Sequence, residues 1–368
     1  MFKVPRRISA LVVAIGLFVF QTLPAFACGG LVAPNGSVRL AHAATLVAWH
    51  GGIEQYMTSF SYQGDSSNFG WIVPLPAVPI QVQEGGAWTL QRLFLETHPI
   101  VHEVVNAAVQ ASAAAGSAQV LQQVKVEALN ITVVRGSGQA VLDWARANGF
   151  AVDNETRDHL LAYAQGSPIF MAAKYDVASA RARHQFQGDG TPVLITMKTE
   201  HLWVPLEILA LDGQEVQADV YLLTDSPVNT SDFGSLVGQS AVGTQVPGAP
   251  GFTLAFQEKM TPTLYHDLST DRNMSWVRPD SWLTYLRLDA PDTTVTYDMG
   301  ISPNGVIRLA HFGTPPMAVV DGQMSHELPG WLPKLPLGTP QILLGLLVLV
   351  ALGSWTLLFY RARTKSRM

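Results

Sequence analysis

Hydrophobic and polar residues alternate along several short stretches of this chain, which is the pattern of half-buried β-strands. Between residues 216 and 222, the Val, Ala, Val and Leu at even positions face one way, and the Gln, Asp and Tyr at odd positions face the other. The same period predicts strands over 56–62, 191–197 and 202–211. These stretches make antiparallel sheet the main component of the predicted fold.

Blocks with helical spacing are concentrated between about residues 87 and 164. Helices are predicted at four places, 87–96, 102–115, 137–148 and 154–164. The last two form a predicted helical hairpin, because Gly149 is the expected C-cap of the first helix and Asn154 the expected N-cap of the second.

A proline-rich stretch, FGWIVPLPAVP at 69–79, has the apolar content of a strand. Its residues Pro74, Pro76 and Pro79 cannot donate hydrogen bonds to a neighbouring strand, so we expect the stretch to lie at a sheet edge or to leave the sheet. Residues 230–250 are rich in Gly and Ser and are predicted to form a long surface loop.

One nine-residue phrase occurs twice, as PNGSVRLAH at 34–42 and PNGVIRLAH at 303–311. Pro followed by Asn-Gly is strong turn chemistry, because Pro fixes φ and Gly takes positive φ without steric cost. A strand is predicted after each turn, with Leu40 and His42 on one face and Arg39 on the other. We therefore expect two turn-strand units of one shape, paired as neighbours in a sheet that joins the early and late parts of the domain.

Both ends of the chain carry membrane-type signals. Residues 1–27 have a basic head, a short apolar run and small residues near the end, which predicts a secretory signal peptide cleaved after Ala27. Residues 341–360 form a nearly uncharged run long enough to cross a bilayer, and the basic tail 361–368 follows it. The predicted location is the cell membrane, crossed once, with the N-terminal domain outside and the C-terminus in the cytoplasm.

The part between these signals is predicted to be an extracytoplasmic domain. It spans 28–327, either as one unit or as two packed lobes, and the repeated phrase favours one unit because it would pair an early with a late segment. Four prolines in 328–340 predict a stiff stalk between this domain and the membrane span.

Composition narrows the class of partner. Only 14% of residues are charged and the mean hydropathy is positive, as expected for a chain that lies partly in lipid. Three of the 23 Lys and Arg residues lie in 1–27 and four in 361–368, so 16 remain between them against 28 Asp and Glu, a net charge of −12. Nucleic acid requires a basic face, so the partners we expect are the membrane, through the C-terminal helix, and an envelope protein.

Cys28 is the only cysteine, so no disulfide can form within the chain and the fold must rest on its core. A lipoprotein signal would leave Cys28 first in line for acylation, although Ala25 and Phe26 are unusual for such a signal. The thiol could instead pair with another molecule, or be a small residue without a special role.

Candidate binding residues come from the repeat and from nearby aromatic positions: Arg39, His42, Arg308, His311, Tyr62 and Trp71. His42 and His311 would supply two imidazoles if the copies met, but no Cys, Asp or Glu stands at ligand spacing beside them, which favours a structural role. Tyr62 and Trp71 would suit a carbohydrate or peptide groove, with core packing as the alternative that residue type favours.

No metal site is predicted, and the weak candidates are His98 and His102. These residues are four apart, but Pro99 starts a helix after His98 and so places it at a cap. The sequence has no nucleophile elbow, zinc-protease motif, phosphate-binding loop or EF-hand loop, so no catalytic residue or cofactor is assigned.

Several separated blocks resemble one family. They are CGG at 28–30, SYQGDSSNFGWIVPLPAVP at 61–79, the stretch 141–177, and WLTYLRL at 282–288. They are similar to the bacterial Domain of Unknown Function 2330 family over nearly all of 28–327. The resemblance implies no activity and no catalytic residue. Family members often have a further cysteine soon after CGG, where this chain has GLVAP.

The expected fold is α+β, a mostly antiparallel sheet domain with a helical segment around 87–164, plus one C-terminal transmembrane helix. The expected function is a non-enzymatic binding or scaffolding module of the bacterial cell envelope. Two alternatives stand beside it: an envelope hydrolase whose site is assembled from distant residues, and a metal- or redox-linked accessory factor that uses Cys28 and the histidines.

Overall fold

The computed structural model describes residues 30–33, 38–64, 68–86, 88–98, 120–166, 168–182, 190–210, 215–231, 239–302 and 305–310. All of them belong to one compact unit. The predicted signal peptide, stalk, span and tail lie outside these ranges, as do Cys28, His102, His311 and the helix expected at 102–115. No helix in the described part is long and apolar enough to cross a membrane.

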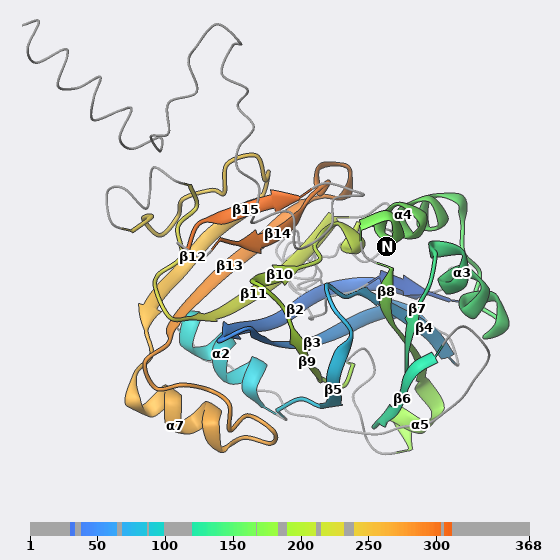
Figure 1. The fold of residues 1–368 in the computed structure, drawn as a ribbon, viewed down its shortest axis with the longest axis horizontal. Helices are drawn as coiled ribbons and strands as arrows, with labels where there is room; N and C mark the ends of the chain where they lie inside the picture. The colour runs from blue at the N-terminus through green and yellow to red at the C-terminus, as the bar shows by residue number, and fades with distance from the viewer. Residues whose placement is uncertain are drawn as a thin grey trace, which may run out of the picture. The chain divides into compact units, whose positions relative to one another are not determined.

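The largest sheet has seven strands in the order β12-β13-β11-β2-β3-β9-β5 (Figure 1). The strands are β2 (Val38–His50), β3 (Ile53–Gly64), β5 (Pro79–Glu84), β9 (Val193–Lys198), β11 (Glu215–Thr224), β12 (Phe252–Lys259) and β13 (Trp282–Pro291). Neighbours are antiparallel except β2 and β11, which are parallel. The prediction of a sheet-dominated, mostly antiparallel α+β fold is therefore confirmed.

Two smaller antiparallel sheets accompany it. One has the order β1-β4-β8-β7-β6, with β1 (Gly30–Val32), β4 (Asn68–Pro74), β6 (Val120–Val126), β7 (Leu129–Arg135) and β8 (Ile169–Asp176). The other has the order β10-β14-β15, with β10 (Leu202–Val204), β14 (Asp298–Ile301) and β15 (Ile307–Ala310).

The seven-stranded sheet is buried on both faces. Leu46 and Met57 lie in one apolar cluster with Leu268, on the face covered by helices α2 (Thr89–Thr97) and α7 (Pro262–Thr270). Val47 and Phe60 lie in a second cluster, which the other face shares with the two smaller sheets. Each buried Leu or Phe stabilises the fold by about 1.5–3 kcal/mol, so this layered packing supplies the stability that a disulfide would otherwise add.

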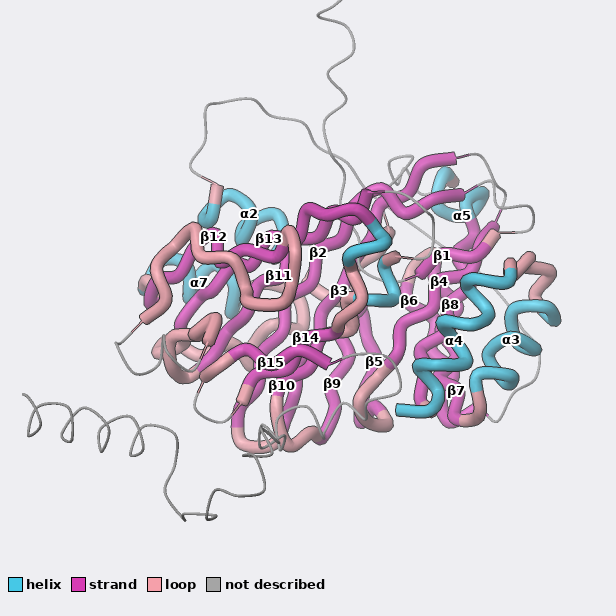
Figure 2. Tube along the Cα trace, turned by 90° about the horizontal axis from the view of Figure 1, so that it is seen from above, coloured by secondary structure: helices cyan, strands magenta, loops and turns pink. Residues whose placement is uncertain are grey.

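The predicted helical hairpin is confirmed as α3 (Gly138–Ala147) and α4 (Asn154–Gly166). Both views place it beside β7 and β8, away from α2 and α7 (Figures 1 and 2). Gly149 follows α3 with a φ of +78°, as expected for a glycine that ends a helix. The N-cap prediction was wrong by one residue, because the Asp153 carboxylate, not Asn154, accepts the hydrogen bond from the Thr156 amide at 2.7 Å.

The expected concentration of helices around 87–164 holds only in part. The helix predicted at 87–96 is present as α2, but β6 and β7 also fall within this segment. Helices α5 (Val177–Arg181) and α7 lie beyond it, as do the 3₁₀ turns η1 (Glu207–Leu209) and η2 (Asp292–Thr294). The start of α7 has a local signal that periodicity alone misses, because Thr261 caps it and Pro262 is its first residue.

The proline-rich stretch leaves its first sheet, which is one of the two predicted alternatives, and then enters a second sheet, which was not predicted. Its first half is β4, which lies between β1 and β8 and not at an edge, so the edge alternative is wrong there. Pro74 is the last residue of β4, and Pro79 is the first residue of β5, an edge strand of the seven-stranded sheet. The strand predicted at 202–211 ends at Val204 because Pro205 follows, and the chain continues as η1.

The two copies of the repeated phrase both enter strands, but these strands are not neighbours. The first copy leads into β2 of the seven-stranded sheet and the second into β15 of the three-stranded sheet, so the predicted pairing is wrong. A β-bulge between Leu40 and His42 also interrupts the alternation expected in the first copy. Gly305 takes a φ of +79°, which is the positive angle expected of the turn glycine.

Candidate functional site

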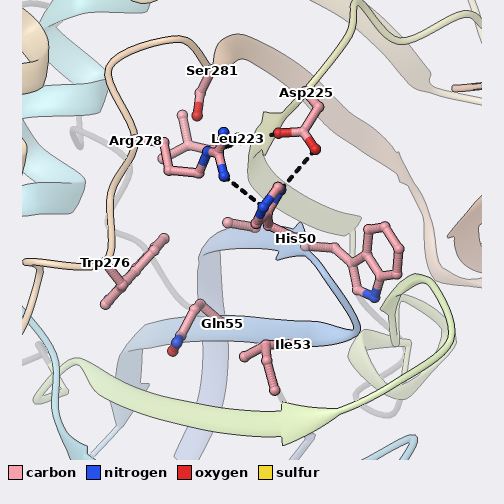
Figure 3. A pocket seen from close by; sticks show the side chains of 10 residues that line it. His50, Ile53, Gln55, Leu223, Asp225, Trp276, Arg278 and Ser281 are labelled. Carbon is pink, nitrogen blue, oxygen red and sulfur yellow. Dashed lines mark hydrogen bonds and ion pairs between the residues drawn. The ribbon is translucent and has the colours of Figure 1, made fainter.

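A pocket of about 250 Å³ opens where the β2–β3 hairpin turns (Figure 3). Ala48, Leu223 and Trp276 place it on the side of the seven-stranded sheet that α2 and α7 cover, because all three pack in that cluster. Three segments line it: Ala48, Trp49, His50, Ile53 and Gln55 of the hairpin, Leu223 and Asp225 at the end of β11, and Trp276, Arg278 and Ser281 from the segment before β13.

The hairpin turn positions His50 at the rim. His50 and Ile53 are paired across the two strands, and the turn between them consists of Gly51 and Gly52, with φ of +58° and +82°. Positive φ at both turn residues matches the twist of a β-hairpin and is strained for most other residues. Gly51 and Gly52 thus allow a two-residue turn, which places the adjoining ends of β2 and β3 at the pocket.

The parallel pairing of β2 with β11 supplies the second side chain. Ala48 pairs with Leu223, so the residues two positions further along, His50 and Asp225, emerge next to each other at the ends of the two strands. The His50 Nδ1 and Asp225 Oδ2 atoms lie 2.8 Å apart, although the two residues are 175 positions apart in the sequence. Register between distant strands, not a local motif, creates this contact.

Arg278 completes the rim and fixes the tautomer of His50. Its Nη1 lies 2.5 Å from His50 Nε2, and an arginine can only donate, so Nε2 accepts and Nδ1 carries the hydrogen given to Asp225. The Nε and Nη2 atoms of Arg278 donate to the two oxygens of Asp280 at 3.3 and 3.2 Å. This contact lowers the pKa of Asp280 and raises that of Arg278, so both remain charged.

A second polar cluster lies under α2, on the same side of the sheet. The Asp219 carboxylate accepts from the Tyr285 hydroxyl at 2.6 Å and from Tyr221 at 3.4 Å. His42 Nε2 lies 3.7 Å from the same carboxylate. Burial lowers the pKa of His42 to about 4 and raises that of Asp219, so His42 is neutral and this contact is not an ion pair at neutral pH. The ring of His98 lies 5.0 Å from that of Tyr285.

Comparison with known proteins adds a family. Residues 23–246, more than half of the chain, match the family described as "Uncharacterized protein conserved in bacteria (DUF2330)". The chain belongs to this family. In this DUF2330 protein the matched region contains His50 and Asp225 but ends before Trp276 and Arg278.

Curated proteins and solved structures give no further relative from which a function could be inferred. No curated protein matches the chain. Among solved structures, the crystal structure of baculovirus P35 is similar at 7% identity, covering 75% of this chain and 92% of that one with a TM-score of 0.32. A likeness at this TM-score supports no inference about fold or function.

The candidate residues from the sequence that the structure describes do not line the pocket. Arg39 is exposed on β2 and Arg308 is half-buried on β15. Tyr62 and Trp71 are buried, so they pack in the core and do not line a groove. They belong to an aromatic cluster with Phe60, Phe69 and Tyr175. His42 is also buried, at 7% exposed, and does not reach a surface that a ligand could contact.

The described residues contain no group of three or more His, Cys, Asp or Glu side chains that could hold a metal ion. His98 is placed in the cluster under α2, and its predicted partner His102 lies outside the described residues. The rim residues His50, Asp225 and Arg278 were missed because each is an ordinary polar residue at a strand end or in a loop. The one local signal was Gly51-Gly52, which predicts a hairpin but not what lies beside it.

Proposed function

We propose that the chain is a single-pass, membrane-anchored extracytoplasmic protein of the bacterial cell envelope that binds a partner protein through this pocket. The observation that carries the proposal is the rim. His50, Asp225 and Arg278 come from segments up to 228 positions apart, and His50 hydrogen bonds to both of the others, yet the three side chains remain 38–53% exposed. Apolar walls with a few fixed polar groups at the mouth are the composition of a binding site.

The size of the pocket favours a macromolecular partner. At about 250 Å³ it is smaller than the roughly 300–1,000 Å³ of sites that enclose a whole small molecule. It has room for one side chain or one ring of something larger. The net charge of −12 between residues 28 and 360 agrees with a protein partner and disfavours nucleic acid.

The location in the envelope rests on the sequence of the two ends. A signal peptide at 1–27 and an apolar run at 341–360 followed by a basic tail support export with one remaining anchor. Cell fractionation tests this directly. The protein should resist alkaline extraction from membranes, and a protease added outside spheroplasts should digest the domain and spare a tag placed after residue 368.

Partner binding is tested with tagged full-length protein extracted from its own membranes in mild detergent. The wild type should retain a partner in stoichiometric amount, and Trp276→Ala should lose it at a temperature where its melting curve shows that it is still folded. Asp158→Asn is the control, because Asp158 is exposed on α4, beside a different sheet. Equal retention of the partner by Trp276→Ala, or no partner on the wild type, contradicts the proposal.

An envelope hydrolase is the second candidate, favoured by one observation. A carboxylate orients Nδ1 of His50, and Ser281 lines the same pocket, which are the three residue types of a serine hydrolase. Against it, Arg278 occupies the Nε2 atom that would have to take the proton from a serine. Turnover of p-nitrophenyl acetate by Arg278→Ala that disappears in Arg278→Ala/Ser281→Ala would establish this function. No observation among the described residues favours a metal or redox role.

A further inference from the structure

The charge balance at the pocket rim is negative. Two carboxylates, Asp225 and Asp280, face one guanidinium, Arg278, whose Nη1 also contacts His50. Arg278 and Asp280 cancel each other, because two N–H groups of the first donate to the two oxygens of the second. One unit of negative charge remains, and it resides on Asp225.

Asp225 also has acceptor capacity to spare. Its Oδ2 accepts from His50, but the nearest cationic atom to its Oδ1 among the described residues is Arg278 Nε at 3.9 Å, which is beyond a hydrogen bond. The side chain is 53% exposed at the mouth. In contrast, Arg278 already uses Nε, Nη1 and Nη2, so an anion would have to displace existing partners to bind there.

The walls below the rim are apolar and aromatic. Figure 3 shows Ile53 and Gln55 on one side of the pocket, with Trp276 across from Asp225. The neighbouring Trp49 packs against the cluster on the opposite face of the sheet, where its indole donates to the Thr199 carbonyl at 3.1 Å, so the aromatic wall of the pocket is Trp276. Indole faces attract cations, and alkyl groups pack against them, so one ligand can satisfy both the walls and the rim.

We propose that the pocket receives a basic side chain of the partner protein, with its apolar stem against Trp276 and its ammonium or guanidinium group on Asp225. This inference rests on the proposed binding function and names the chemistry that the partner presents. The volume fits one such side chain, and the acidic surface of the domain raises the local concentration of basic groups.

The test begins with panning of a random hexapeptide library against full-length protein in mild detergent. Wild type should enrich Lys or Arg at one position, and Asp225→Asn should lose that preference. The best peptide is then labelled, and its binding is compared by fluorescence anisotropy with a version in which norleucine replaces the basic residue. Norleucine keeps the stem and lacks the charge, so we expect at least tenfold weaker binding to wild type and no difference on Asp225→Asn. Asp158→Asn is the charge-matched control and should bind as wild type.

The outcomes separate this inference from the proposed function. Enrichment of apolar or acidic residues, or equal binding of the norleucine peptide, contradicts the assignment of a basic side chain as the ligand. If Trp276→Ala still abolishes binding in that case, the pocket remains the binding site. Binding that Trp276→Ala leaves unchanged, or no enrichment on wild type, overturns both. Competition by cadaverine at the same concentration as the peptide would identify a free amine as the ligand, which overturns the assignment to a protein side chain.

Discussion

The Tyr285 hydroxyl donates a 2.6 Å hydrogen bond to the Asp219 carboxylate under α2, where Asp219 is only 3% exposed. A carboxylate can stay in such a place only because neighbouring groups satisfy its oxygens. This pair therefore offers the most direct check of the layer formed by α2 and the seven-stranded sheet.

Tyr285→Phe should lower the free energy of unfolding by about 1–3 kcal/mol, since it leaves an oxygen of a buried carboxylate without its shortest hydrogen bond. Urea unfolding measures the change. Tyr221→Phe is the matched comparison, because Tyr221 lies 3.4 Å from the same carboxylate and should cost less. An equal cost for the two variants would contradict the ranking.

Glu54 should make the protein less stable as the pH rises. Complete burial raises the pKa of Glu54 from 4.5 to about 8, and the Thr199 side chain and Trp203 backbone offset only part of this effect. Between these pH values the unfolded chain loses the proton and the folded chain keeps it, so stability present below about pH 4.5 is lost toward pH 8. Glu54→Gln should remove this loss.

The measurement is urea unfolding of wild type and Glu54→Gln at pH 5 and pH 8. Relative to the wild type, the free energy of unfolding of the variant should rise by about 2–5 kcal/mol from pH 5 to pH 8, given about 1.4 kcal/mol per pKa unit. Glu258→Gln, at an exposed position on β12, should show no such gain. The idea fails if both variants track the wild type.

His42 should act in the opposite direction. Burial lowers the pKa of His42 from 6.5 to about 4, so the unfolded chain binds a proton that the folded chain refuses. The contribution of neutral His42 to the free energy of unfolding is complete above about pH 6.5 and is lost as the pH falls to about 4. The His42→Gln variant should therefore lose less stability than the wild type as the pH falls. Circular dichroism between pH 7 and pH 4 measures the fraction of folded protein for both. His266→Gln, exposed on α7, should retain the wild-type slope.

The hairpin turn should be intolerant of alanine for conformational reasons. A Cβ added at Gly51 would meet no atom within 4 Å, but its φ of +58° disfavours residues with a side chain. Gly51→Ala should cost about 1–2 kcal/mol and weaken peptide binding, because His50 precedes the turn. Gly51→Asn should cost less, since asparagine adopts this conformation more readily. Equal unfolding midpoints for both variants would show that the turn is not strained.

The sequence predicts the local elements well and their partners poorly. Periodicity identified the strand that became β11 and the α3–α4 hairpin, because these patterns are written within about ten residues. The repeated phrase failed as a guide to pairing, since two nearly identical phrases lead into strands of different sheets. The sequence also does not show which aromatic residues are buried. Trp71 stands beside prolines and resembles a ligand platform until β8 is known to pair with its strand.

The site depends most on what a sequence does not display. His50, Asp225 and Arg278 meet because β2 and β11 align in one register and because the segment before β13 returns to the same strand ends. No spacing rule connects positions that are 175 and 228 residues apart. Only the Gly51-Gly52 turn left a local trace.

The parallel pairing of β2 with β11 also sets the order in which the domain can become competent. Strand β2 emerges early during synthesis, but its neighbour β11 follows more than 160 residues later, and Arg278 later still. Closing so long a loop is slow, and it cannot begin until the second strand has been synthesised. A chain that ends before residue 278 would contain β2 and His50 but not Arg278, so the rim of the pocket can form only after most of the domain has been synthesised.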